Sequence, residues 1–136
     1  LPRGQFIYSN GTGTGQIDRL AVVSFSIAAS GTTTYDLRSG MTDVLNRALV
    51  LAKLKFVYME LDAAVTGNVW FGPQNQSNGI ELWFDGKGTT ARERVLHKML
   101  HDNPAGWTVD SSNKVIAIVN GTGATVAGKL VLGGNA

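Results

Sequence analysis

Apolar and polar side chains alternate in many short stretches of this chain, and turn-forming residues separate the stretches. A period of two residues is that of a β-strand with one face buried and one face in water. Seventeen glycines and only three prolines are spread along the 136 residues. Dipeptides such as asparagine-glycine and serine-glycine favour tight reversals of the chain. The pattern therefore predicts a series of short strands joined by turns.

We expect about nine strands. They occupy residues 5–9, 16–30, 32–37, 53–61, 67–72, 79–86, 105–111, 113–120 and 124–134. Residues 53–61 carry apolar side chains on both faces, which is typical of a strand buried between two layers. The aromatic strands 67–72 and 79–86 are joined by a polar loop that begins at Pro73, so we expect them to be neighbours.

Two further segments have patterns that fit more than one structure. Residues 39–49 contain a helix-capping residue, Thr42, and predict either a short helix or a wide turn. Residues 90–101 fit a helix, because Thr90 and Glu93 have capping-box spacing, but their apolar positions fit a strand as well. Both alternatives stay open for each segment.

The predicted fold class is all-β in the main. We expect an antiparallel β-sandwich or a jelly-roll-like barrel with at most one or two short helices. Residues 16–136 are expected to form a single domain, since a chain of this length buries a sizeable core without metal or disulfides. Residues 1–15 are rich in glycine and threonine and are predicted to form an extended N-terminal arm.

Charge and hydrophobicity narrow the classes of partner. The formal net charge is +2 and no long basic run is present, so we expect no sequence-specific nucleic-acid partner. The longest apolar run, residues 48–52, lies between Arg47 and Lys53. A bilayer span needs about 20 apolar residues, so we expect no membrane partner. The absence of cysteine fits a reducing compartment and a particle outside a cell equally well.

The two histidines, His97 and His101, have the spacing of the zinc-binding helix motif HExxH. Lys98 occupies the position of the glutamate that acts as general base in that motif, and its positive charge disfavours a dication. The sequence supplies two clear ligands where a structural zinc site uses four. We therefore expect neither a metal nor any other cofactor.

Catalytic motifs are equally weak. The glycines of residues 10–15 do not have the GxGxxG spacing of a phosphate cradle, and there is no GxSxG nucleophile motif. Scattered acids could still meet in the fold as a hydrolase pair. Those acids are Glu60, Asp62, Glu81 and Asp85. The sequence predicts a protein that is not an enzyme and has no catalytic residue.

Aromatic residues are the strongest candidates for a contact site. Trp70 and Phe71 are adjacent, as are Trp83 and Phe84, and neighbouring residues of a strand point to opposite faces. One ring of each pair should therefore face away from the core, where it could contact a subunit or a ligand. The other interpretation is that another part of the same sandwich covers the second ring.

Residues 42–61 and 103–134 resemble a family of small β-rich virion structural proteins of tailed bacteriophages and prophages. The shared features are Thr42 and Asp43, the lysine-spaced apolar strand 53–61, the glycine-tryptophan pair at Gly106, and the closing strands that end at Gly133. The resemblance implies a capsid decoration or cement protein, a head fibre or a tail part. It also implies location in the virion after assembly in the host cytoplasm, a homo-oligomer such as a trimer, and binding to a major capsid protein.

A carbohydrate-binding module is the alternative function. Trp70 or Trp83 would stack on a sugar ring in that case. Asn75, Gln76 and Asn78 would donate and accept hydrogen bonds to its hydroxyl groups.

Overall fold

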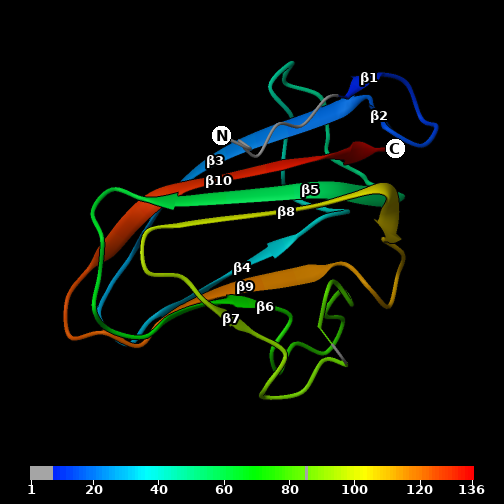
Figure 1. Cartoon of the computed structure of the whole chain (residues 1–136). Helices are drawn as coiled ribbons and strands as arrows, with labels where there is room; N and C mark the ends of the chain where they lie inside the picture. The colour runs from blue at the N-terminus through cyan, green and yellow to red at the C-terminus, as the bar shows by residue number, and fades with distance from the viewer. Residues whose placement is uncertain (1–7, 85) are drawn as a thin grey trace, which may run out of the picture.

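The computed structural model describes residues 8–84 and 86–136, and within them the regular structure consists of strands and turns (Figure 1). The strands are β1 (Ser9–Asn10), β2 (Gln16–Ile17), β3 (Arg19–Ile27), β4 (Thr32–Asp36), β5 (Lys53–Leu61), β6 (Val69–Gly72), β7 (Glu93–Arg94), β8 (Lys98–Thr108), β9 (Val115–Asn120) and β10 (Val126–Asn135). These residues contain no helix long and apolar enough to cross a membrane.

Two four-stranded antiparallel sheets form the body of the molecule. One has the order β3-β10-β5-β8 and the other β4-β9-β6-β7, and Figure 1 shows them as two layers. Strands pair in a nested way, β3 with β10, β4 with β9, β5 with β8 and β6 with β7. Eight strands nested in two sheets are the arrangement of a double-sheet jelly roll. The all-β antiparallel sandwich is thus confirmed, as two facing sheets and not as a closed barrel.

The core lies between the two sheets. In β5, Leu54, Val57, Met59 and Leu61 are buried, and the alternate residues Tyr58 and Glu60 are only half-buried. In β9, Ile116 and Ile118 are fully buried and belong to the same cluster as the β5 residues. The predicted strand 53–61 has the same bounds as β5, which confirms the strand. Burial between two layers was wrong, because one face of β5 packs on the core and Phe56, Tyr58 and Glu60 lie half-buried on the other.

The predicted strand at 79–86 was wrong. Over its described residues, 79–84 and 86, the backbone makes one isolated bridge, between Gly79 and Val115, and no ladder. Strand β6 already pairs with β7 and β9, so no free edge remains for the expected neighbour. Ile80 and Leu82 are nevertheless buried, because alternate side chains of this segment pack on the core.

Residues 90–101 take the extended alternative. They contain β7 and the start of β8, and β8 continues through Pro104 to Thr108, so the separate strand predicted to begin at residue 105 does not exist. Between the pairs Phe56–Asp102 and Leu54–Trp107 the register shifts, with four residues of β8 opposite one of β5. The bulge consists of residues 103–106, Asn-Pro-Ala-Gly, whose asparagine, proline and glycine are also typical of turns.

Residues 39–49 form the wide turn, and the helix alternative was wrong. An isolated bridge joins Thr42 to Ala48, and Asn46 at the tip has a φ of 62°. Asparagine tolerates this left-handed conformation better than most residues. The side chain of Asp43 accepts hydrogen bonds from the backbone of Leu45 and Arg47, which closes the turn instead of starting a helix.

The described part of the predicted N-terminal arm, residues 8–15, contacts the β3-β10-β5-β8 sheet. The Tyr8 hydroxyl donates to the backbone oxygen of Lys55 at 3.1 Å, and the Gly15 amide donates to that of Pro104 at 3.0 Å. Burial raises the pKa of Tyr8 to about 12, with the nearby Asp102 carboxylate acting in the same direction. Residues 1–7 lie outside the described residues, so an arm there remains a prediction, as does most of the predicted strand 5–9.

Candidate interaction surface

A cluster of aromatic rings lies between the two sheets, near the edge formed by β8 and β7. The Trp83 ring lies 3.8 Å from that of His101, 5.0 Å from Phe84, 5.5 Å from Trp107 and 5.9 Å from Phe71, measured between centroids. His101 and Trp107 come from β8 in one sheet and Phe71 from β6 in the other. Trp83 therefore fills the gap between the sheets.

Glu93 contacts the polar groups of this aromatic cluster. Its Oε1 accepts a hydrogen bond from Trp83 Nε1 at 3.1 Å and lies 2.8 Å from His101 Nε2. All three side chains are only partly exposed. A buried tryptophan N–H usually finds such a partner. The contacts tie β7 and the 79–84 segment to β8 and give the cluster a clear structural role.

The four aromatic residues predicted from the sequence separate into two groups. Phe71 is fully buried, and Trp83 and Phe84 pack partly against the core. Trp70 lies on the other face of β6, where the guanidinium of Arg92 covers its ring at 3.9 Å from the centroid. Phe71 and Trp83 thus meet, whereas Trp70 stays apart from them.

The predicted polar groups do not converge on one site. His97 is exposed while His101 belongs to the aromatic cluster, and no set of three or more histidine, aspartate or glutamate side chains in the described chain is arranged to hold a metal. Glu60 and Asp62 line one open depression with Tyr58, Lys129 and Val131, and Glu81 is not among its lining residues. Asp85 lies outside the described residues.

The outer face of the β3-β10-β5-β8 sheet carries an apolar row that crosses all four strands. The row consists of Val22, Val131, Tyr58 and Leu100, which are paired in this order by the strand register. Val22 is 49% exposed and Leu100 is 38% exposed. Their neighbours along the strands, such as Ala21 and Met99, are buried in the core. The sheet is therefore apolar on both faces, and only one of them is used by the core.

The apolar row is flanked by a row with three charged residues on one side and a row with one charged residue on the other. The next register row consists of Ser24, Lys129, Glu60 and Lys98, and the row on the opposite side consists of Leu20, Gly133, Phe56 and Asp102. The Tyr58 hydroxyl donates a hydrogen bond to Glu60, and this bond lowers the pKa of the Glu60 carboxyl, with help from the nearby Lys98. Glu60 is thus a carboxylate at neutral pH.

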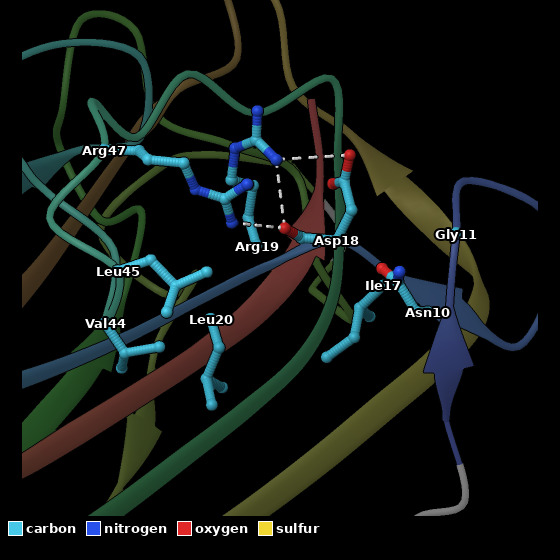
Figure 2. Close-up of a pocket in the computed structure, with 9 residues that line it drawn as sticks. All are labelled: Asn10, Gly11, Ile17, Asp18, Arg19, Leu20, Val44, Leu45 and Arg47. Atoms are coloured by element: carbon cyan, nitrogen blue, oxygen red, sulfur yellow. Dashed lines mark hydrogen bonds and ion pairs between the residues drawn. The ribbon is translucent and has the colours of Figure 1, made fainter.

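A groove extends the apolar surface at the Leu20 end of the sheet (Figure 2). It has a volume of about 700 Å³, and Val44 and Leu45 of the 39–49 turn form one wall. These two side chains are 55% and 68% exposed. Figure 2 shows the guanidinium groups of Arg19 and Arg47 converging on Asp18 at the rim, where both donate to the Asp18 backbone oxygen at 3.0 and 2.9 Å.

Asp43 fixes the turn that carries Val44 and Leu45. Its carboxylate accepts from the Arg47 and Leu45 amides at 2.8 and 3.0 Å, and Arg47 Nε donates to it at 2.7 Å. Burial by itself would raise the pKa of Asp43, but these hydrogen bonds and the Arg47 charge outweigh it and hold the pKa below 3.8. The ionised form of Asp43 therefore stabilises the turn.

This contribution gives a predicted pH dependence. Because the folded-state pKa is lower than that of the unfolded chain, the stabilisation is fully present above pH 3.8 and is lost as pH falls through the lowered pKa. We expect Asp43→Asn to be less stable than the parent at pH 7 and to lose less stability on acidification. Urea unfolding at pH 7, 4 and 3 measures both effects. Equal pH slopes for the two proteins would contradict the assignment.

The apolar row is the feature that the sequence did not reveal. Each of its four residues comes from a different strand, and only the register brings them together. The one available signal was that residues 53–61 are apolar on both faces, and this was interpreted as burial between layers. Comparison of the chain with protein-family models and with curated proteins found no match.

Proposed function

We propose that this chain is a structural subunit of a virus particle, which acts by binding copies of itself and other coat subunits and transforms no substrate. The observation that carries the proposal is the apolar row on the outer sheet face. Monomeric proteins rarely expose contiguous apolar patches larger than roughly a few hundred Å². Larger exposed apolar patches are typical of protein interfaces. The groove beside Leu45 extends the same surface.

The fold supports this proposal at the level of analogy. Double-sheet jelly rolls occur in viral capsid domains, lectins and cupins, so the fold alone does not select among these functions. The decoration or cement role implied by the sequence resemblance is a narrower form of the proposal, with a major capsid protein as second partner and the virion as location. A subunit of the shell itself is the other form, and capsid jelly rolls favour it.

The tryptophans favour assembly over carbohydrate binding. A sugar-stacking tryptophan presents a free ring face to solvent. Here His101 stacks on Trp83 at 3.8 Å and Arg92 covers Trp70 at 3.9 Å. A sugar would have to displace these contacts. In addition, the side-chain oxygen of Asn75, one of the expected sugar contacts, accepts a hydrogen bond from Thr89 at 3.2 Å.

Light scattering and negative-stain electron microscopy of the purified chain test the proposal. We expect oligomers at micromolar concentration that persist in high salt, because the contact is mainly apolar, and ordered assemblies at higher concentration. A chain that stays monomeric at every concentration would contradict the proposal. A monomer whose tryptophan fluorescence changes on addition of polysaccharide would also favour the carbohydrate-binding alternative.

A further inference from the structure

We infer that a second copy of this chain docks on the outer face of the β3-β10-β5-β8 sheet, in a two-fold arrangement whose axis runs parallel to the strands. The inference rests on the proposed function and names the surface and geometry of one of its contacts. Two of the three register rows on the outer face, the apolar row and the charged row, are complementary when the strand order is reversed. The third row lies at the margin of the proposed contact, because the Tyr8 ring of the same chain packs on Phe56 there at 5.5 Å between centroids.

A two-fold axis parallel to the strands places β3 of one copy over β8 of the other, and β10 over β5. Residues at the same height along the strands then face each other. In the apolar row, Val22 meets Leu100 of the second copy and Val131 meets Tyr58. Four apolar contacts result, since each pair occurs twice.

The charged row is complementary in the same arrangement. Lys129 of β10 meets Glu60 of β5 in the second copy, and the symmetry repeats this pair. Both residues lie on the two central strands, so a face-to-face contact removes them from water. Charges in the centre of an interface need a partner of opposite sign, because an unpaired buried charge is strongly unfavourable.

A two-fold axis perpendicular to the strands gives a poorer match. It places each strand over its own copy and reverses the rows, so Glu60 faces Phe56 and Lys129 faces Gly133. Glu60 and Lys129 would then lose water and keep only the contacts within their own chain, such as the ion pair between Glu60 and Lys98 at 4.0 Å. Lys98 would meet Asp102, but both lie on the edge strand β8, where an exposed ion pair contributes little. The parallel axis is therefore favoured.

Cysteine cross-linking tests the geometry directly, because the chain has no cysteine of its own. Val22→Cys and Leu100→Cys proteins are mixed and treated with a short bis-maleimide, which bridges thiols on sheets packed about 10 Å apart. We expect a cross-linked dimer in the mixture and little in either protein alone. Cross-linking of Val22→Cys to itself would overturn the parallel axis, and no cross-linking in any combination would overturn the interface.

Charge exchange provides a second readout in the full chain. Lys129→Glu and Glu60→Lys are each expected to weaken the dimer by at least about 10-fold, because like charges then face each other. The double exchange should restore affinity to within about 3-fold of the parent. Lys98→Gln is the matched control: Lys98 faces Ser24 in this arrangement, and the neutral amide removes its 4.0 Å ion pair with Glu60 without placing a like charge beside that carboxylate, so we expect a change of less than about 5-fold. Lys129 and Glu60 are also cross-strand neighbours within one chain, so a substitution could change folding as well as dimerisation. Thermal melting of each variant distinguishes an effect on folding from an effect on the dimer.

The outcomes distinguish this inference from the proposed function. Oligomers or particles that form normally, without the Val22–Leu100 cross-link and without sensitivity to the charge exchange, overturn this interface and leave the proposed function standing. A chain that is monomeric at all concentrations overturns both. Loss of the dimer in Lys98→Gln, with no effect of Lys129→Glu, would favour the perpendicular axis and overturn the inference.

Discussion

Replacing Asn120 with alanine is expected to lower the free energy of unfolding by about 3 kcal/mol, a large effect for one polar side chain. Asn120 is fully buried at the end of β9. Its Nδ2 donates to the backbone oxygens of Ile27 and Ala124 at 2.9 and 2.7 Å. Its Oδ1 accepts from the Thr122 amide at 3.0 Å.

These bonds connect three parts of the chain. Ile27 ends β3 in one sheet, Asn120 ends β9 in the other, and residues 121–125 lead into β10. Alanine would leave buried carbonyl and amide groups without partners, and the desolvation of each such group costs about 1–3 kcal/mol. The side chain therefore acts as a polar connection between the two sheets at this end of the sandwich.

Chemical denaturation of the parent and of Asn120→Ala measures the effect. Asn68→Ala is a suitable control, because Asn68 lies close to the same turn but is exposed. We expect the control to change stability by less than about 0.5 kcal/mol. If Asn120→Ala is no less stable than the control, the hydrogen bonds at this end contribute little and the sheets are held by apolar packing alone.

Sequence pattern was sufficient where a strand has simple burial. The bounds of β5 were predicted from apolar side chains on both of its faces, and β9 and β10 differ from the predicted strands by one or two residues at their ends. Residues 16–30 were expected to be one strand but form β2 and β3, which are separated at Asp18. The Asp18 amide still donates to Gly134 of β10, whereas β2 before it pairs with β1 in a separate small sheet.

The hydrophobic pattern gave a wrong strand where side chains pack on the core but the backbone is not paired with another strand. Ile80 and Leu82 alternate with polar residues as a strand would, because their side chains enter the core. Their backbone has no partner strand beyond the bridge at Gly79. Periodicity reports which side chains are buried and cannot report whether a free sheet edge exists beside them.

The candidate surface depends on how the strands pair and in which register. Trp83 and Phe71 could be named from the sequence because large aromatic residues are conspicuous, but their contact with His101 could not. The apolar row requires the register of three strand pairs at once. A shift by one residue in any strand pair would turn that strand's member of the row to the other face of the sheet. No local pattern contains this information.

Replacing Trp83 with alanine should lower the free energy of unfolding by about 3 kcal/mol. The ring packs on the core and contacts four other rings from both sheets. Its removal opens a cavity where the sheets meet, and neighbouring rings fixed on strands cannot move far enough to fill it. It also leaves Glu93 without the Nε1 donor at 3.1 Å.

Trp83→Phe separates the two contributions, because it keeps an aromatic ring and removes only the N–H and part of the volume. We expect it to recover more than half of the lost stability, with a remaining deficit of about 1 kcal/mol from the hydrogen bond to Glu93. Trp70→Ala is the matched comparison, since Trp70 lies on the outer side of β6 under Arg92. We expect Trp70→Ala to lower the free energy of unfolding by less than Trp83→Ala does.

If Trp70→Ala proves the more destabilising change, the aromatic cluster does not hold the sheets together. Trp83 would then again be a candidate ligand contact, because a large aromatic side chain that contributes little to stability needs another explanation, such as binding.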